Sequence, residues 1–217
     1  MEHNWAAENL QTIRTLMERS AIYRRALAPI STFVGATGIL ATFASWQFKV
    51  DSARSFAAFW MAVSLVALVG AFLLARRQAL KDREVFWSPP TRRVAQAMLP
   101  ALSVGFFTGV LVFLLDPEGK EYAGGVSLVW CILYGCALHA AGFFMPRGIK
   151  LLGWLFILTG CGFILALIFN FHGVTGESSP LDPLFDARGL FMGLTFGGLH
   201  LAYGIYLYLS KQRKNET

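Results

Sequence analysis

The sequence predicts an all-α protein that crosses a membrane six times, and three observations lead to this fold class. Of the 217 residues, 55% are apolar and only 15% are charged. The apolar residues gather into six runs of about twenty residues, the length that an α-helix needs to cross a hydrocarbon core of roughly 30 Å. No Asp, Glu, Lys or Arg lies well inside any of these runs. A transmembrane barrel would need alternating strands of about ten residues, and the runs lack that pattern.

Residues 1–28 precede the spans and predict an amphipathic helix. Apolar residues recur there at helical spacing, at Leu10, Ile13, Met17 and Ala21, among charged residues. Such a helix lies on a membrane surface or against a partner. The charges also exclude a secretory signal peptide, which needs an uninterrupted apolar core near its start. The segment is either a docking or regulatory helix or a simple interfacial approach to the first span.

The predicted transmembrane domain fills residues 29–210, and residues 211–217 form a short tail. The six spans are expected at residues 29–48, 55–75, 94–115, 123–145, 151–171 and 189–209. Pro29 falls in the first turn of its span, where a proline costs no helical hydrogen bond, whereas Pro100 is expected to kink the third span. We expect residues 76–93 to form a charged loop and residues 173–188 to form the longest loop on the opposite side.

The distribution of Lys and Arg predicts that both termini lie in the cytoplasm. Four of these residues precede the first span, six lie in residues 76–93, two follow the fourth span and three lie in the tail, so one side carries fifteen. The other side carries four, at Lys49, Arg54, Lys120 and Arg188. Positive charge of this kind accumulates on the cytoplasmic side, where it meets anionic lipid headgroups. Because the charge flanks the spans and forms no aromatic-interleaved basic face, we expect no nucleic-acid partner.

Two of the predicted cytoplasmic segments resemble a group of bacterial multi-pass membrane proteins with no known activity. The segments are Phe86–Arg93, with the sequence FWSPPTRR, and Arg14–Arg25, with the sequence RTLMERSAIYRR. The resemblance implies a location in the bacterial inner membrane. It implies no substrate, cofactor or catalytic residue.

The predicted spans lack the residues that enzymes and coupled transporters use. The zinc-protease, nucleophile-elbow and P-loop motifs are missing, and the three cysteines, at positions 131, 136 and 161, have no metal-binding spacing. Ion-coupled transporters usually keep an ionisable residue inside the membrane. We therefore favour a non-enzymatic sensor, regulator or assembly subunit, whose partner would be a second copy or a cytoplasmic protein. The alternatives are a small transporter or channel, and a redox subunit linked to haem b or a quinone.

Two histidines inside the spans mark the candidate functional site. Each shares its helix face with glycines at helical spacing. The residues are Gly135, His139 and Gly142 on the fourth span and Gly197, His200 and Gly204 on the sixth. At 1.5 Å per residue from the charged ends, the two imidazoles lie about 12 Å and about 16 Å from the cytoplasmic edge. They therefore form a matched pair on parallel helices.

Three interpretations of this pair stay open. In the first, the glycine faces allow close helix packing, and each imidazole bonds to a nearby carbonyl or hydroxyl group. In the second, the pair lines a pocket between helices four and six for a quinone or another lipophilic molecule. In the third, the imidazoles ligate haem b or a transition metal. Glycine faces bring helices together, which fits the third interpretation poorly, so we expect no resident cofactor.

Overall fold

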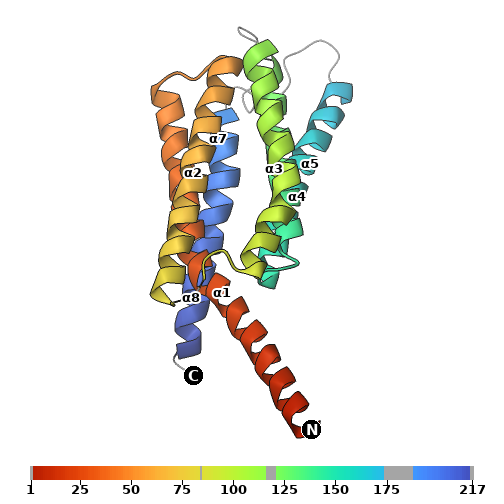
Figure 1. Ribbon diagram of the computed structural model, residues 1–217. Coiled ribbons are helices and arrows are strands. Elements are labelled where there is room, and N and C mark those ends of the chain that lie inside the picture. Colours follow the sequence, from red (N-terminus) through yellow and green to blue (C-terminus); the bar gives the residue numbers. More distant parts are fainter. Residues whose placement is uncertain (1, 84, 116–120, 174–187, 216–217) are drawn as a thin grey trace.

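The computed structural model describes residues 2–83, 85–115, 121–173 and 188–215, and within these ranges it contains helices and no strands. Figure 1 shows an elongated bundle whose two termini lie at the same end. Five apolar helices are long enough to cross a membrane, and the apolar part of a further helix, Gly125–Ala141, is shorter. The chain is an all-α polytopic membrane protein, as the sequence predicts.

The helices follow one another with short connections. They are α1 (Glu2–Gln47), α2 (Ala53–Lys81), α3 (Pro89–Leu115), α4 (Glu121–Ala141), α5 (Arg147–Gly173), α7 (Arg188–Met192), the π-helix η1 (Gly193–Leu199) and α8 (His200–Asn215). The last three continue into one another without a break, and we call them together helix six.

Several helices extend beyond the apolar runs that predict them. α1 runs without interruption from Glu2 through Pro29, so the expected N-terminal helix and first span are one helix, whose first turns project from the bundle in Figure 1. α2 and α3 leave only residues 82–88 between them, so most of the predicted loop 76–93 is helical. Helices continue past the apolar core because each further turn still pairs its backbone groups. Most side chains of residues 1–25, the predicted outer loop at 174–187 and the last two tail residues lie outside the described residues.

The helices divide into two groups of three. α1 packs against α2 and against helix six, and α4 packs in the same way against α3 and α5. We call α1, α2 and helix six the first half, which lies on the left in Figure 1, and α3, α4 and α5 the second half. A repeat in chain order would group spans one to three and four to six, and the observed packing follows a different division.

Glycines let α1 and helix six approach backbone to backbone. A Cβ atom added to Gly38 would lie 2.8 Å from the Cα atom of Gly197, and one added to Gly197 would lie 2.9 Å from the backbone nitrogen of Ile39. The hydroxyl oxygen of Thr42 lies 3.0 Å from the Gly38 carbonyl oxygen and 3.3 Å from that of Gly189, so its proton is shared between the two helices. Small residues and hydroxyl groups drive helix association where lipid removes the hydrophobic driving force.

The same kind of packing joins α4 to α5. A Cβ atom added to Gly135 would lie 2.8 Å from the carbonyl oxygen of Gly153, and one added to Gly153 would lie 2.7 Å from the backbone nitrogen of His139. The thiol of Cys131 donates a hydrogen bond to the carbonyl oxygen of Phe156 at 3.3 Å. The glycine face of α4 therefore meets α5, whereas that of helix six meets α1.

Gly162 gives a prediction about a glycine outside these contacts. It lies within α5, and a Cβ atom added there would have no other atom within 4 Å. Because alanine restricts the unfolded chain and suits a helix, we expect Gly162→Ala to raise the free energy of unfolding by about 0.5–1 kcal/mol. Unfolding by SDS in detergent, followed by circular dichroism, measures this change. A loss of stability would instead indicate that Gly162 packs against a second copy of the chain.

Two buried clusters connect the halves. The distal cluster, on the side away from the termini, contains Ala41, Ala53, Phe56, Trp60, Val126 and Met192. The proximal cluster, which extends towards the termini, contains Leu27, Cys131, Leu138, Ile149, Leu152 and Phe156. Each cluster draws residues from α1 and from α4, so both bridge the two halves.

Candidate functional site

His200 lies where helix six meets the second half. Its side chain is buried, with 4% of its surface exposed. Nδ1 lies 2.7 Å from the carbonyl oxygen of Phe196, one turn earlier, and Nε2 lies 2.8 Å from the hydroxyl oxygen of Tyr134 on α4. A hydrogen bond between two side chains therefore joins helices four and six, and with them the two halves.

The partners of the His200 ring determine which nitrogen carries the proton. The carbonyl oxygen of Phe196 can only accept a hydrogen bond, so Nδ1 is the donor in this contact. In a neutral imidazole the other nitrogen is then an acceptor, and the Tyr134 hydroxyl donates its proton to Nε2. Both polar ends of the buried ring are thus satisfied without a charge, which is the state that suits a membrane interior.

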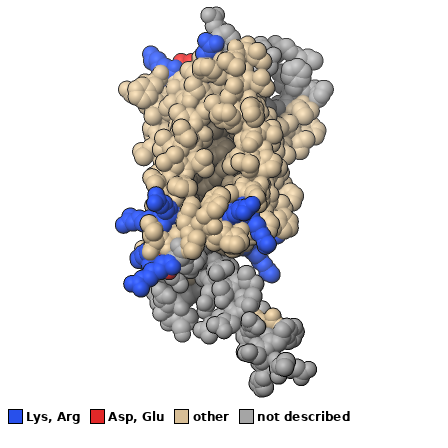
Figure 2. All heavy atoms as spheres, viewed as in Figure 1, with Lys and Arg blue, Asp and Glu red and all other residues tan. Residues whose placement is uncertain are grey.

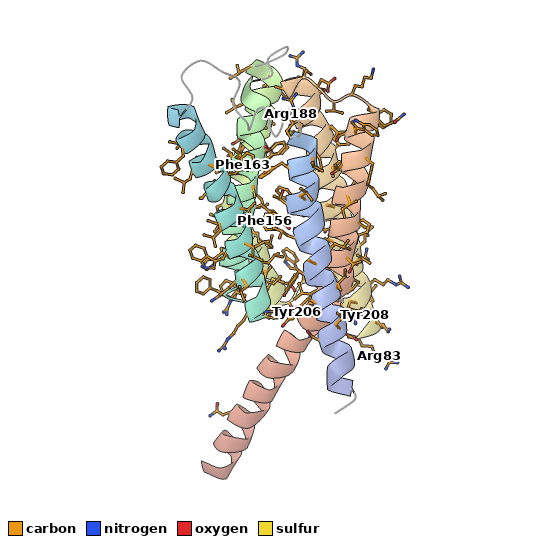
Figure 3. All side chains as sticks on the ribbon, turned by 180° about the vertical axis from the view of Figure 1, so that it is seen from behind. Arg83, Phe156, Phe163, Arg188, Tyr206 and Tyr208 are labelled. Atoms are coloured by element: carbon orange, nitrogen blue, oxygen red, sulfur yellow. The ribbon has the colours of Figure 1, made fainter. Side chains whose placement is uncertain are left out.

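Aromatic rings enclose this hydrogen bond. The rings of Tyr134 and Phe156 lie 5.1 Å apart, and each lies 5.1 Å from the ring of Phe196. The His200 ring lies 5.4 Å from both Tyr134 and Phe156. Figure 3 shows Phe156, together with Phe163, in the space between α5 and helix six. These rings come from α4, α5 and helix six, so the aromatic cluster fills the seam between the halves.

A seven-residue π-helix, Gly193–Leu199, directly precedes His200. Glycines at positions 189, 193 and 197 of helix six face α1. In an α-helix, residues four apart drift by about 40° around the axis, whereas a π-helix winds more residues into each turn. The π-helix therefore helps to keep these glycines against α1. Short π-helical segments occur frequently at functional sites.

His139 occupies a different environment from His200. It follows Tyr134 by five residues, which places the two side chains about 140° apart around α4. Its ring meets the rings of Phe143 and Trp154 edge-on, at centroid distances of 5.6 and 5.4 Å. The two histidines predicted to form a matched pair therefore lie among different neighbours, and they do not face each other.

Gly142 and Gly204 also lie in contacts between helices. A Cβ atom added to Gly142 would lie 2.9 Å from the backbone nitrogen of Lys150 on α5, and one added to Gly204 would lie 2.9 Å from the backbone nitrogen of Thr32 on α1. The four glycines among the predicted site residues thus line two separate helix pairs.

The two imidazoles do not form a ligand pair for a haem iron in this arrangement. Both nitrogens of His200 are already hydrogen bonded within the chain, and the ring of His139 packs against two aromatic side chains of its own. Within the described residues, no three or more His, Cys, Asp and Glu side chains gather where they could hold a metal ion. We derive no redox step from these residues.

His139 gives a second prediction, because its Nδ1 atom is buried without a hydrogen-bond partner in the described part of the chain. A buried polar group that lacks a partner loses stability relative to an apolar group of similar shape. We expect His139→Leu to leave the free energy of unfolding unchanged or to raise it by about 1 kcal/mol. SDS unfolding of the two proteins measures the difference, and a clear loss of stability would show that Nδ1 has a partner.

The sequence analysis singled out His200 but missed Tyr134, Phe156 and Phe196. Aromatic residues are common in membrane helices, so their identity alone does not mark a site. The useful signal is a requirement of His200: a buried imidazole needs two hydrogen-bond partners, and Tyr134 is a hydroxyl-bearing residue in the middle of the neighbouring polar-poor span.

Comparison of the chain with protein-family models, with curated proteins and with solved structures found no match. The resemblance of Phe86–Arg93 and Arg14–Arg25 to bacterial multi-pass membrane proteins therefore stays a prediction. The functional argument rests on the geometry of the described residues.

Proposed function

We propose that this chain is a non-enzymatic sensor or regulatory subunit of a membrane, in which a lipophilic ligand controls the contact between the two halves. The observation that carries the proposal is the hydrogen bond between Tyr134 and His200, because it joins helices four and six inside the bundle. A ligand that enters the seam between these helices would replace one partner of this bond.

The difference between the contacts within and between the halves supports a switch. Within each half, glycines bring backbones together, as at Gly38 with Gly197 and at Gly135 with Gly153. At Tyr134 the halves meet through side chains alone. A hydrogen bond between membrane helices is worth about 0.6–2 kcal/mol, so the differential affinity of one ligand is large enough to displace it. The seam is therefore the part of the bundle that a ligand can most easily alter.

The protonation of His200 restricts the chemistry of the ligand. Its Nε2 atom is an acceptor and would take a hydrogen bond from a ligand hydroxyl group, whereas the Tyr134 hydroxyl would donate to a ligand carbonyl group. The surrounding rings favour an apolar body that stacks or packs on aromatic faces. A lipophilic molecule with a hydroxyl or carbonyl group, such as a quinol or quinone, meets these requirements.

We further propose that the protein lies in a bacterial inner membrane with both termini in the cytoplasm. Fifteen of the 19 Lys and Arg residues fall on the terminal side of the predicted spans, and Figure 2 shows such side chains around the end of the bundle near the termini. The first turns of α1 project from that end in Figure 1 and would offer a docking segment to a cytoplasmic protein or to a second copy.

Mass spectrometry of the purified full-length chain tests the proposal. Lipophilic molecules are extracted from the protein in nanodiscs made with its native lipids, and each is measured per mole of chain. We expect one lipophile at about one equivalent, and a lower amount with Tyr134→Phe, which removes the hydroxyl group and keeps the ring. Tyr208→Phe is the matched control, because Tyr208 is 64% exposed on α8. Absence of a stoichiometric lipophile would contradict the proposal, and solute flux in vesicles would identify a transporter instead.

A further inference from the structure

α2 and α3 touch near the ends that lie away from the termini. A Cβ atom added to Gly109 of α3 would lie 2.7 Å from the Sδ atom of Met61 on α2. Nearby, the Nε atom of Arg54 donates a hydrogen bond to the carbonyl oxygen of Phe113 at 2.9 Å. Below this contact, Figure 2 shows a hollow in the face of the molecule between the two helices.

The exposure of α2 confirms that α3 moves away from it. Leu65, Leu68 and Phe72 lie within about 40° of Met61 around α2, so they continue the face that meets α3. They are nevertheless 61%, 60% and 48% exposed. A face that touches its neighbour at Met61 and is half exposed one to three turns later indicates that the two helices diverge towards the termini.

Apolar residues also form the α3 side of the hollow. Leu99 is 64% exposed there, and Leu102 is half-buried. Met98 packs against the proximal cluster, as Tyr134 does, so the base of the hollow is continuous with the packing around the seam. Pro100 removes a backbone donor from this part of α3, which is a usual cause of a bend away from a neighbour.

Arginines flank the open end of the hollow. Arg76 and Arg77 lie near the end of α2, and Arg92 and Arg93 lie in the first turns of α3; all four are exposed. Arg76 follows Phe72 by four residues and so continues the face that lines the hollow. No ion pair with a carboxylate holds these four side chains within the described part of the chain. Figure 2 shows Lys and Arg side chains on both sides below the hollow.

We propose that the hollow binds one anionic phospholipid of the bilayer. Its acyl chain lies between α2 and α3, and its phosphate group lies between the arginines at the ends of these helices. Guanidinium groups pair with phosphate oxygens through two parallel hydrogen bonds, and the apolar walls suit an acyl chain. This site differs from the Tyr134–His200 contact and does not depend on the function proposed for it.

Lipid titrations monitored by native mass spectrometry test the headgroup part of this proposal. The full-length chain in an uncharged detergent is titrated with dioleoyl phosphatidylglycerol and with dioleoyl phosphatidylcholine. The double variant Arg76→Gln/Arg93→Gln is compared with Lys49→Gln/Arg147→Gln, which removes two charges away from the hollow. We expect the first variant to bind phosphatidylglycerol about 25-fold more weakly, about fivefold for each arginine, and the control to change by less than about twofold. Equal losses in both would overturn the proposal.

A second variant tests whether the acyl chain occupies the hollow. Leu68→Trp fills the hollow from α2, whereas Leu158→Trp adds the same bulk at a position on α5 that is 61% exposed. We expect Leu68→Trp to weaken the binding of both lipids by at least about fivefold and Leu158→Trp to leave it unchanged. Unchanged binding to Leu68→Trp would overturn the proposal. Tyr134→Phe should retain the affinity for phosphatidylglycerol, so this site and the proposed ligand seam can fail separately.

Discussion

Gly197→Val is expected to lower the free energy of unfolding by about 3 kcal/mol or more, because it forces α1 and helix six apart. A Cβ atom at this position would lie 2.8 Å from a side-chain atom of Ile39 and 2.9 Å from its backbone nitrogen, and 3.2 Å from the carbonyl carbon of Gly38. Two of these three atoms belong to the backbone, so they cannot rotate away as a flexible side chain would. SDS unfolding of the purified protein in detergent measures the loss.

Gly162→Val is the control for this substitution. It places the same branched side chain inside α5, where a Cβ atom meets nothing within 4 Å. Its effect is therefore limited to the helix propensity of valine, which is within about 1 kcal/mol of that of glycine. Equal effects of the two valines would show that α1 and helix six are not packed backbone to backbone at Gly197.

Phe156→Ala is expected to cost about 3–5 kcal/mol of unfolding free energy. The Phe156 side chain is fully buried, and its ring contacts those of Tyr134, Phe196 and His200. Its removal leaves a cavity in the seam, and the three remaining rings lose their dispersion contacts with it. Thermal or SDS unfolding of the variant and the parent protein gives the difference.

Two comparison variants show whether this cost arises in the seam. Phe156→Leu keeps most of the volume and should lose only about 1–1.5 kcal/mol. Phe106→Ala truncates a ring that is 56% exposed on α3, and we expect it to lose less than about 1 kcal/mol. If Phe156→Ala were as mild as Phe106→Ala, the aromatic cluster would not hold the halves together.

The membrane explains why the fold could be predicted from the sequence. A chain in lipid must satisfy its backbone within each segment, so an apolar run of sufficient length is already a helix. The ends of α2 and α3 were harder to predict, because charged residues such as Arg76 and Arg93 neither require nor prevent a further helical turn. The N-terminal segment likewise merges into α1 because Pro29 does not end the helix.

The candidate site could be predicted only in part. Helical spacing identified His200 and the glycine faces, because both depend on one helix at a time. The partner of each face depends on how all helices pack, so spacing could not show that Gly135 meets α5 and that Gly197 meets α1. The π-helix before His200 arises from the same long-range fit, and only glycines spaced by four residues hint at it.

Spin labels on the two halves test whether the Tyr134–His200 hydrogen bond holds them in place. Leu73→Cys on α2 and Leu158→Cys on α5 provide attachment sites that are 54% and 61% exposed. The two exposed native cysteines, at positions 136 and 161, are replaced by serine. A third label, Leu40→Cys on α1, is 68% exposed and gives a pair with Leu73→Cys within the first half.

Double electron–electron resonance in nanodiscs then compares the parent protein with Tyr134→Phe. The predicted result is a broader or displaced distance distribution between the halves in Tyr134→Phe, with the distance within the first half unchanged. Identical distributions between the halves in both proteins would contradict the role of Tyr134 and His200 as the contact that a ligand switches.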